Sequence, residues 1–346
     1  MSQRIAVIPG DGIGPEVARI GVRLLESLGL PLQFDWFDFG AERYLRDGTS
    51  LPPGFMDTLR SDYAAVYFGA VGDPRVPGNE HAKEILLAMR FELDLYINLR
   101  PCLLIDDRLS PLKGKGREQL KFVVFRENTE GLYAGVGGAL KKGTPHEVAH
   151  EVDVNTRRGV ERILEAAFAY ARQRGLRRVC MADKANVLVH GHGLWRRTFA
   201  EVSRRHSGIE ARAMYVDALA MDLIRQPEAY EVIVTNNLFG DILTDLGAAL
   251  TGGLGLAASG NIHPGRVSLF EPVHGSAPDI AGQGKANPLA MALSGALMLE
   301  HLGHRDLHDR ILGAIERVVA SGTIRTPDLG GAATTKQMMD AIVAEI

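Results

Sequence analysis

Residues 4–17 read Arg4-Ile-Ala-Val-Ile-Pro-Gly-Asp-Gly-Ile-Gly-Pro-Glu-Val17, and they decide the fold because a strand-like run passes through a glycine-rich turn into a helix. The helix is indicated by apolar residues three or four apart from Val17 to Leu28, with Gly29 as a stop. A dinucleotide-binding fingerprint would need a third glycine at position 15, which is a proline here. The stretch therefore predicts a strand–turn–helix unit that is not a standard Rossmann domain. Whether its glycines serve only a positive-φ turn or also contact a ligand stays open.

Short strand-like runs alternate with longer helical patterns over the rest of the chain. The strand-like runs are residues 32–36, 64–69, 122–125, 179–181, 232–234 and 267–270. The helical patterns are residues 156–174, 191–206, 239–251, 288–302 and 306–321. This alternation predicts an α/β fold with a largely parallel sheet covered by helices on both faces. Two stretches differ: residues 127–153 predict a hairpin arm, and the glycine-rich residues 252–265 predict a loop, a candidate hinge or domain crossing.

Length and composition describe an ordinary globular protein. The chain has 346 residues, which suggests two domains, and 39 basic against 42 acidic side chains give a net charge of −3. This balance argues against a nucleic-acid or anionic-membrane binder. Cys102 and Cys180 lie in apolar runs and are interpreted as core residues in a reducing compartment. Because the sequence shows no membrane-spanning stretch and no signal peptide, we expect a cytoplasmic protein.

Acidic residues recur between positions 217 and 245. Asp241 and Asp245 are four residues apart, so that on a helix both carboxylates share one face, and Asp217 and Asp222 lie upstream. Clustered carboxylates repel one another unless a cation neutralises them, and oxygen ligands suit Mg²⁺ or Mn²⁺. The alternative is that these residues are acids near helix N-termini, where the helix dipole favours them.

Basic residues suggest a site for an acidic substrate. Arg90, Arg100 and Arg126 would suit a di- or tricarboxylate, although each alone could equally be a surface ion-pair partner. Lys184 follows a strand-like run and is a candidate general base, with Tyr133 as the matching acid; both could instead be solvated loop residues. The small residues after His274 would admit a nucleotide backbone closely, or form a plain surface turn.

Taken together, six ordered motifs resemble the β-decarboxylating hydroxy-acid dehydrogenases, the isocitrate/isopropylmalate dehydrogenase family. They are Gly10-Asp-Gly-Ile-Gly-Pro-Glu-Val17, Asn98-Leu-Arg-Pro101, Arg126-Glu-Asn-Thr-Glu-Gly131, Asp183-Lys-Ala-Asn-Val187, Thr235-Asn-Asn-Leu-Phe-Gly-Asp-Ile-Leu-Thr-Asp245 and Glu271-Pro-Val-His-Gly-Ser-Ala-Pro-Asp279. Arg90 and Asn287-Pro288 also fit. The resemblance implies a doubly wound two-domain fold, with one domain at residues 1–99 plus 253–346 and the second at 100–252. It also implies a homodimer with shared active sites, interlocked by an arm near residues 133–153.

The resemblance assigns a role to each candidate residue. Asp241, Asp245 and the neighbouring subunit's Asp217 would hold Mg²⁺ or Mn²⁺, and K⁺ is a further candidate as an activator. Catalytic roles fall to Tyr133, Lys184 and Asp217, whereas Arg90, Arg100 and Arg126 would hold the carboxylate that is later lost as CO₂. Cofactor contacts are implied for Ile13, Glu271, His274, Gly275, Ser276, Ala277, Asp279, Ile280 and Asn287. An acid at position 279 would accept from a ribose 2′-hydroxyl and repel a 2′-phosphate, so we predict NAD.

Different features of the sequence indicate different substrates. Leu86 and Leu87 lie in the stretch that would line the substituent pocket, and they suit an isopropyl group. We therefore expect 3-isopropylmalate as the substrate and 2-oxo-4-methylpentanoate plus CO₂ as the products, which implies a role in leucine biosynthesis. Residues 126–131, by contrast, are similar to isocitrate, homoisocitrate and tartrate/D-malate members, and Lys83 replaces the glutamate of isopropylmalate enzymes. These acids are the alternative substrates. A non-enzymatic binder of small carboxylates is the alternative from another class.

Overall fold

The computed structural model of the chain describes residues 2–346, which divide into two compact units. Unit 1 comprises residues up to Leu95, Arg100–Leu120 and Ala248–Ile346, and unit 2 comprises Tyr96–Leu99 and Lys121–Gly247. Residues 100–120 were predicted to lie in the second domain, whereas in the structure they group with unit 1. Arg108 explains this difference, because its guanidinium donates to the carbonyl oxygens of Val319 and Ala320 in unit 1.

Unit 1 contains five strands that follow one another side by side in the order β2-β1-β3-β12-β11. Its strands are β1 (Gln3–Gly10), β2 (Leu32–Trp36), β3 (Ala65–Ala70), β11 (Ala258–Ile262) and β12 (Ser268–Pro272), and β4 (Ile97–Leu103) runs from unit 2 into unit 1. Its helices are α1 (Gly14–Ser27), α2 (Ala41–Asp47), α3 (Phe55–Asp62), α4 (Glu80–Ala82), α5 (Ala88–Glu92), α10 (Leu289–His301), α11 (Arg305–Ser321) and α12 (Thr335–Glu345). All pairings among these five strands are parallel except that of β11 with β12.

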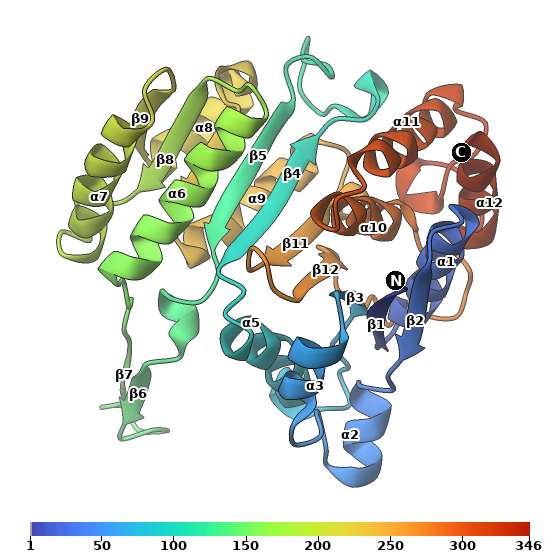
Figure 1. Cartoon of the computed structure of the whole chain (residues 1–346). Coiled ribbons are helices and arrows are strands. Elements are labelled where there is room, and N and C mark those ends of the chain that lie inside the picture. Colours follow the sequence, from blue (N-terminus) through green and yellow to red (C-terminus); the bar gives the residue numbers. More distant parts are fainter. Residues whose placement is uncertain (1) are drawn as a thin grey trace. The chain divides into compact units, whose positions relative to one another are not determined.

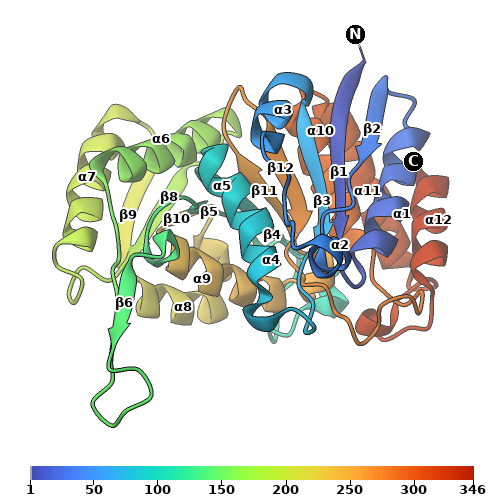
Figure 2. The ribbon, with the colours of Figure 1, turned by 90° about the horizontal axis from the view of Figure 1, so that it is seen from below.

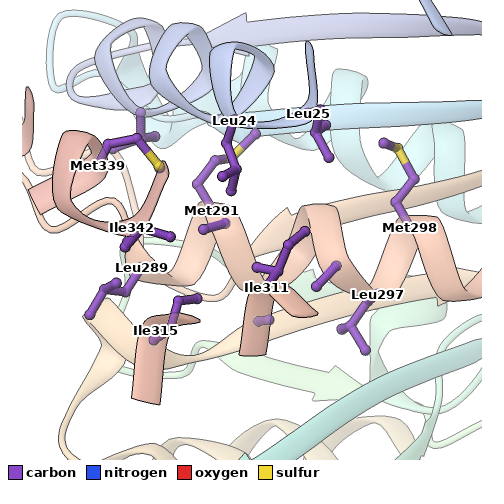
Figure 3. Packing of buried hydrophobic residues seen from close by; sticks show 14 of the residues in the cluster. Leu24, Leu25, Leu289, Met291, Leu297, Met298, Ile311, Ile315, Met339 and Ile342 are labelled. Atoms are coloured by element: carbon purple, nitrogen blue, oxygen red, sulfur yellow. The ribbon is translucent and has the colours of Figure 1, made fainter. Parts of the chain in front are cut away.

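Helices cover both faces of the unit 1 strands, as the alternation in the sequence predicted. On β1, Ile5 and Val7 face one hydrophobic cluster, while Ala6 and Ile8 face the other. The first cluster is formed with α1, α10, α11 and α12, whose leucines, isoleucines and methionines interdigitate in Figure 3. The second cluster is formed with α3 and residues 85–95. Figure 2 shows α1, α11 and α12 gathered at the side of β1 and β2.

Unit 2 is built in the same way around four parallel strands in the order β5-β10-β8-β9. Its strands are β5 (Lys121–Glu127), β8 (Arg178–Asp183), β9 (Glu210–Tyr215) and β10 (Val232–Thr235). Its helices are α6 (Arg157–Gln173), α7 (Gly191–Arg205), α8 (Val216–Arg225) and α9 (Asn237–Leu250), which continues into unit 1. The predicted arm is present as the antiparallel hairpin β6 (Gly137–Leu140) and β7 (Val148–Glu151), which projects from unit 2 in Figure 1.

One prediction about local structure was wrong. The glycine-rich residues 252–265, expected to be a loop, contain β11, which is buried and pairs with β12 along its length. The small side chains Ala258, Ser259 and Gly260 lack the β-branched signature of a strand, but they fit where the sheet is closely covered. Asn261 is satisfied there because its side chain donates to Glu271, with Nδ2 and Oε1 2.7 Å apart.

The two cysteines are core residues, as predicted. Both are free thiols, and burial raises the pKa of Cys102 and of Cys180 to about 12, so that neither is a reactive thiolate at neutral pH. Among residues 2–346, no helix has both the length and the apolar character that crossing a membrane requires.

Candidate active site

Unit 1 brings two of the predicted arginines to one cavity of about 160 Å³. Arg90, from α5, and Arg100, from β4, line it together with Leu86, Glu271 and His274. The cavity lies beyond the ends of β3 and β12, the place at which parallel α/β sheets bind ligands. Two cationic side chains and the apolar side chain of Leu86 therefore line a single pocket.

Arg90 is held by one ion pair that leaves another of its nitrogens able to donate to a ligand. Its side chain is 8% exposed, and Nη2 donates to Oε1 of Glu271 at 3.0 Å. Its Nε is buried and meets no hydrogen-bond acceptor within residues 2–346. A buried guanidinium nitrogen without an acceptor is unfavourable, so the arrangement suits an anionic oxygen supplied by a ligand.

Leu86 reaches the cavity from an irregular turn. Residues 83–87, which link α4 to α5, form a single π-helical turn, a feature that frequently accompanies functional sites. Leu86 belongs to the cavity lining, whereas Leu87 does not. The structure thus places one of the two predicted pocket leucines beside the arginines.

The segment expected to bind the cofactor, residues 274–287, is fastened to the glycine-rich turn after β1. The N–H of Ile13 donates to the carbonyl oxygen of Ser276 at 2.8 Å. Gly12 has a φ of 57°, and a Cβ there would lie 1.9 Å from the same oxygen, so position 12 needs glycine on both counts. The glycines of this turn therefore serve a positive-φ conformation and a close approach within the protein.

The remaining cofactor candidates differ in what they can offer. His274 borders the cavity, and burial lowers its pKa, so its ring is neutral near pH 7. Its buried Nε2 has no partner within the described residues 2–346. Asp279 is exposed, as a ribose contact would require. Ile280 packs on the core, and the Asn287 side chain is already engaged with Asp328 and the Leu289 N–H.

Unit 2 gathers three other candidates around the start of α9. Arg126 is the penultimate residue of β5, with a side chain 1% exposed, and it donates from Nε to the backbone and side-chain oxygens of Asn237 at 2.8 and 3.0 Å. Its Nη1 donates to Oδ1 of Asp241 at 2.6 Å. Tyr133 donates its hydroxyl to Oδ2 of Asp241 at 3.1 Å, and its ring centroid lies 5.0 Å from the guanidinium. Gly240 leaves room for the Arg126 stem, since a Cβ there would lie 2.5 Å from Cγ.

Lys184 and Asp217 form a second pair in unit 2. Nζ of Lys184 lies 2.5 Å from Oδ1 of Asp217, and this hydrogen bond holds the pKa of Asp217 below its ordinary value. The backbone N–H of Lys184 donates to Nδ1 of His192, a fully buried imidazole that the sequence analysis did not single out. His192 lies eight residues after Lys184, and no periodic or motif signal marks it. Asn237 was also missed, because its contact with Arg126 joins residues more than a hundred positions apart.

The predicted metal ligands are only partly assembled by this chain. Asp241 and Asp245 lie one turn apart on α9, whereas Asp217 pairs with Lys184. Within the described chain, residues 2–346, no group of three or more His, Cys, Asp or Glu side chains is arranged to hold a metal ion. Two carboxylates are nevertheless a common protein contribution to Mg²⁺, whose other ligands are water and substrate oxygens. The donors fit such an ion, and the third carboxylate stays a prediction that needs a second subunit.

Comparison with known proteins identifies the family. The chain matches the isocitrate/isopropylmalate dehydrogenase family over residues 4–342. A 3-isopropylmalate dehydrogenase from Thermobifida fusca is 46% identical over 349 residues, covering 99% of this chain and 97% of that protein. A solved structure of isocitrate dehydrogenase from Methylococcus capsulatus has a TM-score of 0.91 and 39% identity, covering 99% of both chains. That of a β-decarboxylating dehydrogenase from Thermococcus kodakarensis has a TM-score of 0.82 and 37% identity, covering 99% of this chain and 96% of that one.

These matches span nearly the whole chain. The protein therefore belongs to the isocitrate/isopropylmalate dehydrogenase family and is a decarboxylating dehydrogenase with that family's α/β fold. The family resemblance, the fold class and the enzyme class predicted from the sequence are confirmed.

Proposed function

We propose that this enzyme oxidises and decarboxylates 3-isopropylmalate to 2-oxo-4-methylpentanoate and CO₂, with NAD as the oxidant and Mg²⁺ or Mn²⁺ as the metal. The observation that carries the proposal is the unit 1 cavity, in which Arg90 and Arg100 lie with Leu86. Guanidinium groups suit the two carboxylates of a malate, and an aliphatic side chain suits a branched alkyl substituent. The T. fusca relative carries the name of the same activity.

The sequence feature that favoured other substrates has a structural explanation. Residues 126–131 differ from typical isopropylmalate enzymes at Asn128 and Glu130. Glu130 accepts from the backbone N–H of Thr156 at 2.8 Å and from its hydroxyl, so its carboxylate is occupied at the start of α6. A residue used in this way adds nothing to substrate choice. Glu130 is therefore a weaker guide to the substrate than Leu86, and D-malate, tartrate, isocitrate and homoisocitrate are the competitors to be tested.

Cofactor and metal would be held by residues that are already in place. We assign NAD to the loop of residues 274–287. The buried Nε2 of His274 has no hydrogen-bond partner within residues 2–346, and the exposed Asp279 would accept from a ribose hydroxyl and repel a 2′-phosphate. We assign the metal to Asp241 and Asp245, with Asp217 of the partner subunit as the third carboxylate. When bound, the cation supplies positive charge beside the substrate hydroxyl, and NAD supplies the hydride acceptor.

The residues of this chain then divide the proton transfers and the binding. Arg90, Arg100 and Arg126 hold the carboxylates. Lys184 takes the hydroxyl proton, directly or through Asp217, as the C2 hydrogen leaves as hydride to NAD. The bond from C3 to the carboxylate then breaks, CO₂ departs, and Tyr133 returns a proton to C3. Substrate and NAD⁺ become oxo acid, CO₂ and NADH, with the hydroxyl proton exchanged through the enzyme.

The arm supports assembly as a homodimer. Val136, Leu140, Val148 and Val152 lie on or beside β6 and β7 and are 43–65% exposed, which is a large apolar content for a two-stranded hairpin. Such a hairpin has no core of its own, and apolar side chains on it typically contact a partner. We propose that the arms of two copies pair, which would also bring each Asp217 to the neighbouring copy's carboxylates.

A substrate panel tests the proposal. NADH formation at 340 nm is measured with Mn²⁺ and K⁺ for 3-isopropylmalate, D-malate, tartrate, isocitrate and homoisocitrate. We expect the highest kcat/KM for 3-isopropylmalate, and we expect Leu86→Ser to lower that value by about tenfold while leaving D-malate nearly unaffected, since one apolar pocket contact contributes about 1–3 kcal/mol. A higher kcat/KM for any other acid contradicts the assignment. Binding of the acids without any formation of NADH would contradict the proposed substrate and cofactor.

A further inference from the structure

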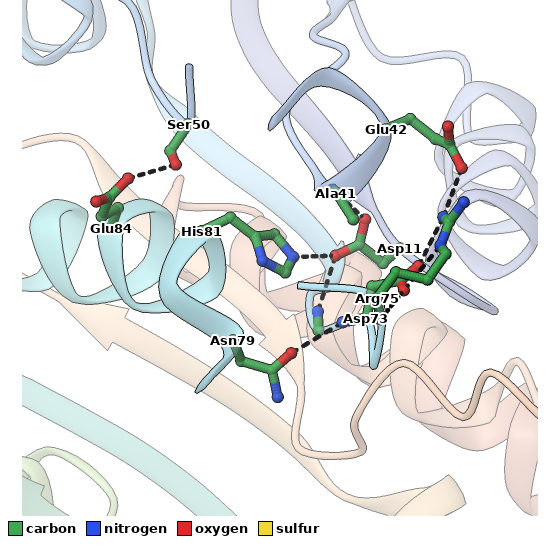
Figure 4. A network of polar contacts seen from close by, with 10 residues as sticks. Asp11, Ala41, Glu42, Ser50, Asp73, Arg75, Asn79, His81 and Glu84 are labelled. Carbon is green, nitrogen blue, oxygen red and sulfur yellow. Dashed lines mark hydrogen bonds and ion pairs between the residues drawn. The ribbon is translucent and has the colours of Figure 1, made fainter. Parts of the chain in front are cut away.

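The segment of residues 80–92 carries Leu86 and Arg90, and it is fastened within unit 1 near both of its ends. At its C-terminal end, Arg90 donates to Glu271 on β12. Near its start, His81 lies with Nε2 2.8 Å from Oδ2 of Asp11, in the glycine-rich turn (Figure 4). His81 is fully buried, and the reaction proposed above does not use it.

Asp11 is a rigid anchor for this contact. Its Oδ1 accepts from the N–H of Ala41 at 2.6 Å, and its Oδ2 accepts from the N–H of Gly72 at 2.8 Å. Its own N–H donates to the Ala70 carbonyl oxygen at 2.7 Å. Because an ionised carboxylate can only accept, His81 must donate from Nε2, which assigns the ring proton to that nitrogen.

The same turn carries the loop of residues 274–287. One residue beyond Asp11, Gly12 lies so close to Ser276 that no side chain fits, and Ile13 donates to the Ser276 carbonyl oxygen. The turn therefore touches the start of the segment 80–92 through Asp11 and the cofactor loop through Gly12 and Ile13. No flexible linker intervenes, since these residues are consecutive.

We propose that His81 is a positioning residue that couples the cofactor loop to the segment 80–92, so that NAD bound at residues 274–287 steadies Leu86 and Arg90. This inference rests on the proposed function in taking NAD as the ligand of that loop. Binding that rigidifies one element favours order in an element hydrogen-bonded to the same anchor. Removal of the imidazole donor leaves the segment attached through Arg90, through Glu84 and through the buried side chains Ile85 and Met89, but its start is no longer bonded to the turn.

A second contact on the same segment provides a matched control. The hydroxyl of Ser50 donates to Oε2 of Glu84 at 2.5 Å, which fastens the outer side of the segment to the loop after α2. Figure 4 shows this contact apart from the Asp11 network. It does not touch the glycine-rich turn, so its loss should loosen the segment without breaking the coupling to the cofactor loop.

Hydrogen–deuterium exchange of the full chain, with and without NAD, tests the coupling. In the wild-type protein we expect NAD to slow exchange in residues 274–287 and also in residues 80–92. The exchange rate in residues 80–92 should fall by about tenfold, which corresponds to the contribution of about one hydrogen bond to the stability of the segment. In His81→Leu, NAD should still protect residues 274–287, but the exchange rates of residues 80–92 with and without NAD should differ by no more than about threefold. His81→Gln, whose amide can donate from a similar position, and Ser50→Ala should keep both.

The outcomes separate the two proposals. If NAD protects residues 274–287 but not 80–92 in the wild-type protein, the coupling is wrong, and no variant is needed to show it. If both regions are protected equally in the wild-type protein and in His81→Leu, the coupling does not run through His81. If NAD protects neither region in the wild-type protein, the proposed cofactor and this inference fail together.

Discussion

Replacement of Arg126 by lysine tests the unit 2 part of the site, because this guanidinium holds three groups at once. It donates to the backbone and side-chain oxygens of Asn237 and to Asp241, and it lies beside the Tyr133 ring. Lysine keeps the positive charge but has a single nitrogen, which cannot reproduce the fork. We therefore expect Arg126→Lys to lower stability and activity together.

The size of the stability loss follows from which partners water can reach. Asp241 is 36% exposed, so water can replace much of what it loses. Asn237 is buried, and its two oxygens would lose their donor without access to water. At about 1–3 kcal/mol for each of the two buried oxygens left unsatisfied, the variant should lose about 2–6 kcal/mol of unfolding free energy. At about 2–4 °C per kcal/mol for a domain of this size, that corresponds to a fall in Tm of at least about 4 °C.

Thermal unfolding and NADH formation measured on the same samples give the two readouts. We expect kcat/KM to fall by at least about a hundredfold, since the proposed proton donor Tyr133 and the proposed metal ligand Asp241 both lose a contact to Arg126. Arg178→Lys is the control, because Arg178 pairs with Glu231 at 3.3 Å while 40% exposed, and such pairs contribute about 0–1 kcal/mol. If Arg126→Lys has the same Tm as the control variant and keeps its kcat/KM within tenfold of the wild type, the contacts of Arg126 do not organise the site.

Four further changes test the assigned roles. Lys184→Met should abolish turnover while carboxylate binding, measured by calorimetry, stays largely intact; unchanged turnover removes this lysine from the mechanism. Asp279→Lys should lower kcat/KM for NAD and raise it for NADP, and an unchanged ratio would show that this carboxylate does not select the cofactor. Gly240→Ala should lower kcat/KM at least tenfold, because its Cβ would lie 2.5 Å from a buried arginine stem, and wild-type kinetics would contradict that packing. A hydrogen bond from His192 holds the pKa of Asp153 below its ordinary value. The contact therefore stabilises the fold fully at a pH above the ordinary pKa of an aspartate, and this stabilisation is lost as the pH falls through the lowered pKa. The Tm difference between the wild type and Asp153→Asn should accordingly shrink at acid pH, and a constant difference would refute this.

Most of the fold could be predicted because hydrophobic periodicity is a local property. The helices α6 and α11 begin and end within one residue or so of the predicted ranges, since each carries a continuous buried stripe. The strand β11 could not be predicted, because Ala258-Ser-Gly-Asn261 has the composition of a loop and is a strand only through its pairing with β12. The grouping of residues 100–120 with unit 1 likewise depends on distant contacts, such as those of Arg108 with Val319 and Ala320.

The site divides along the same line. Helical spacing alone put Asp241 and Asp245 on one face, but nothing local indicates that Arg126 and Tyr133 meet Asp241 across more than a hundred residues. Their roles came from the family resemblance. The buried histidines were not predicted by either approach. His81 contacts the distant Asp11, and His192 contacts the backbone of Lys184 and the side chain of Asp153, and a single buried imidazole leaves no pattern in the sequence.

The most direct test of the proposed reaction is its stoichiometry. NADH and CO₂ are measured in one vessel as the enzyme consumes 3-isopropylmalate in the presence of Mn²⁺. Oxidation coupled to loss of the carboxylate predicts equal amounts of NADH and CO₂, with both absent when EDTA removes the metal. NADH without CO₂, or turnover that survives removal of the metal, would contradict the proposed metal-dependent oxidative decarboxylation.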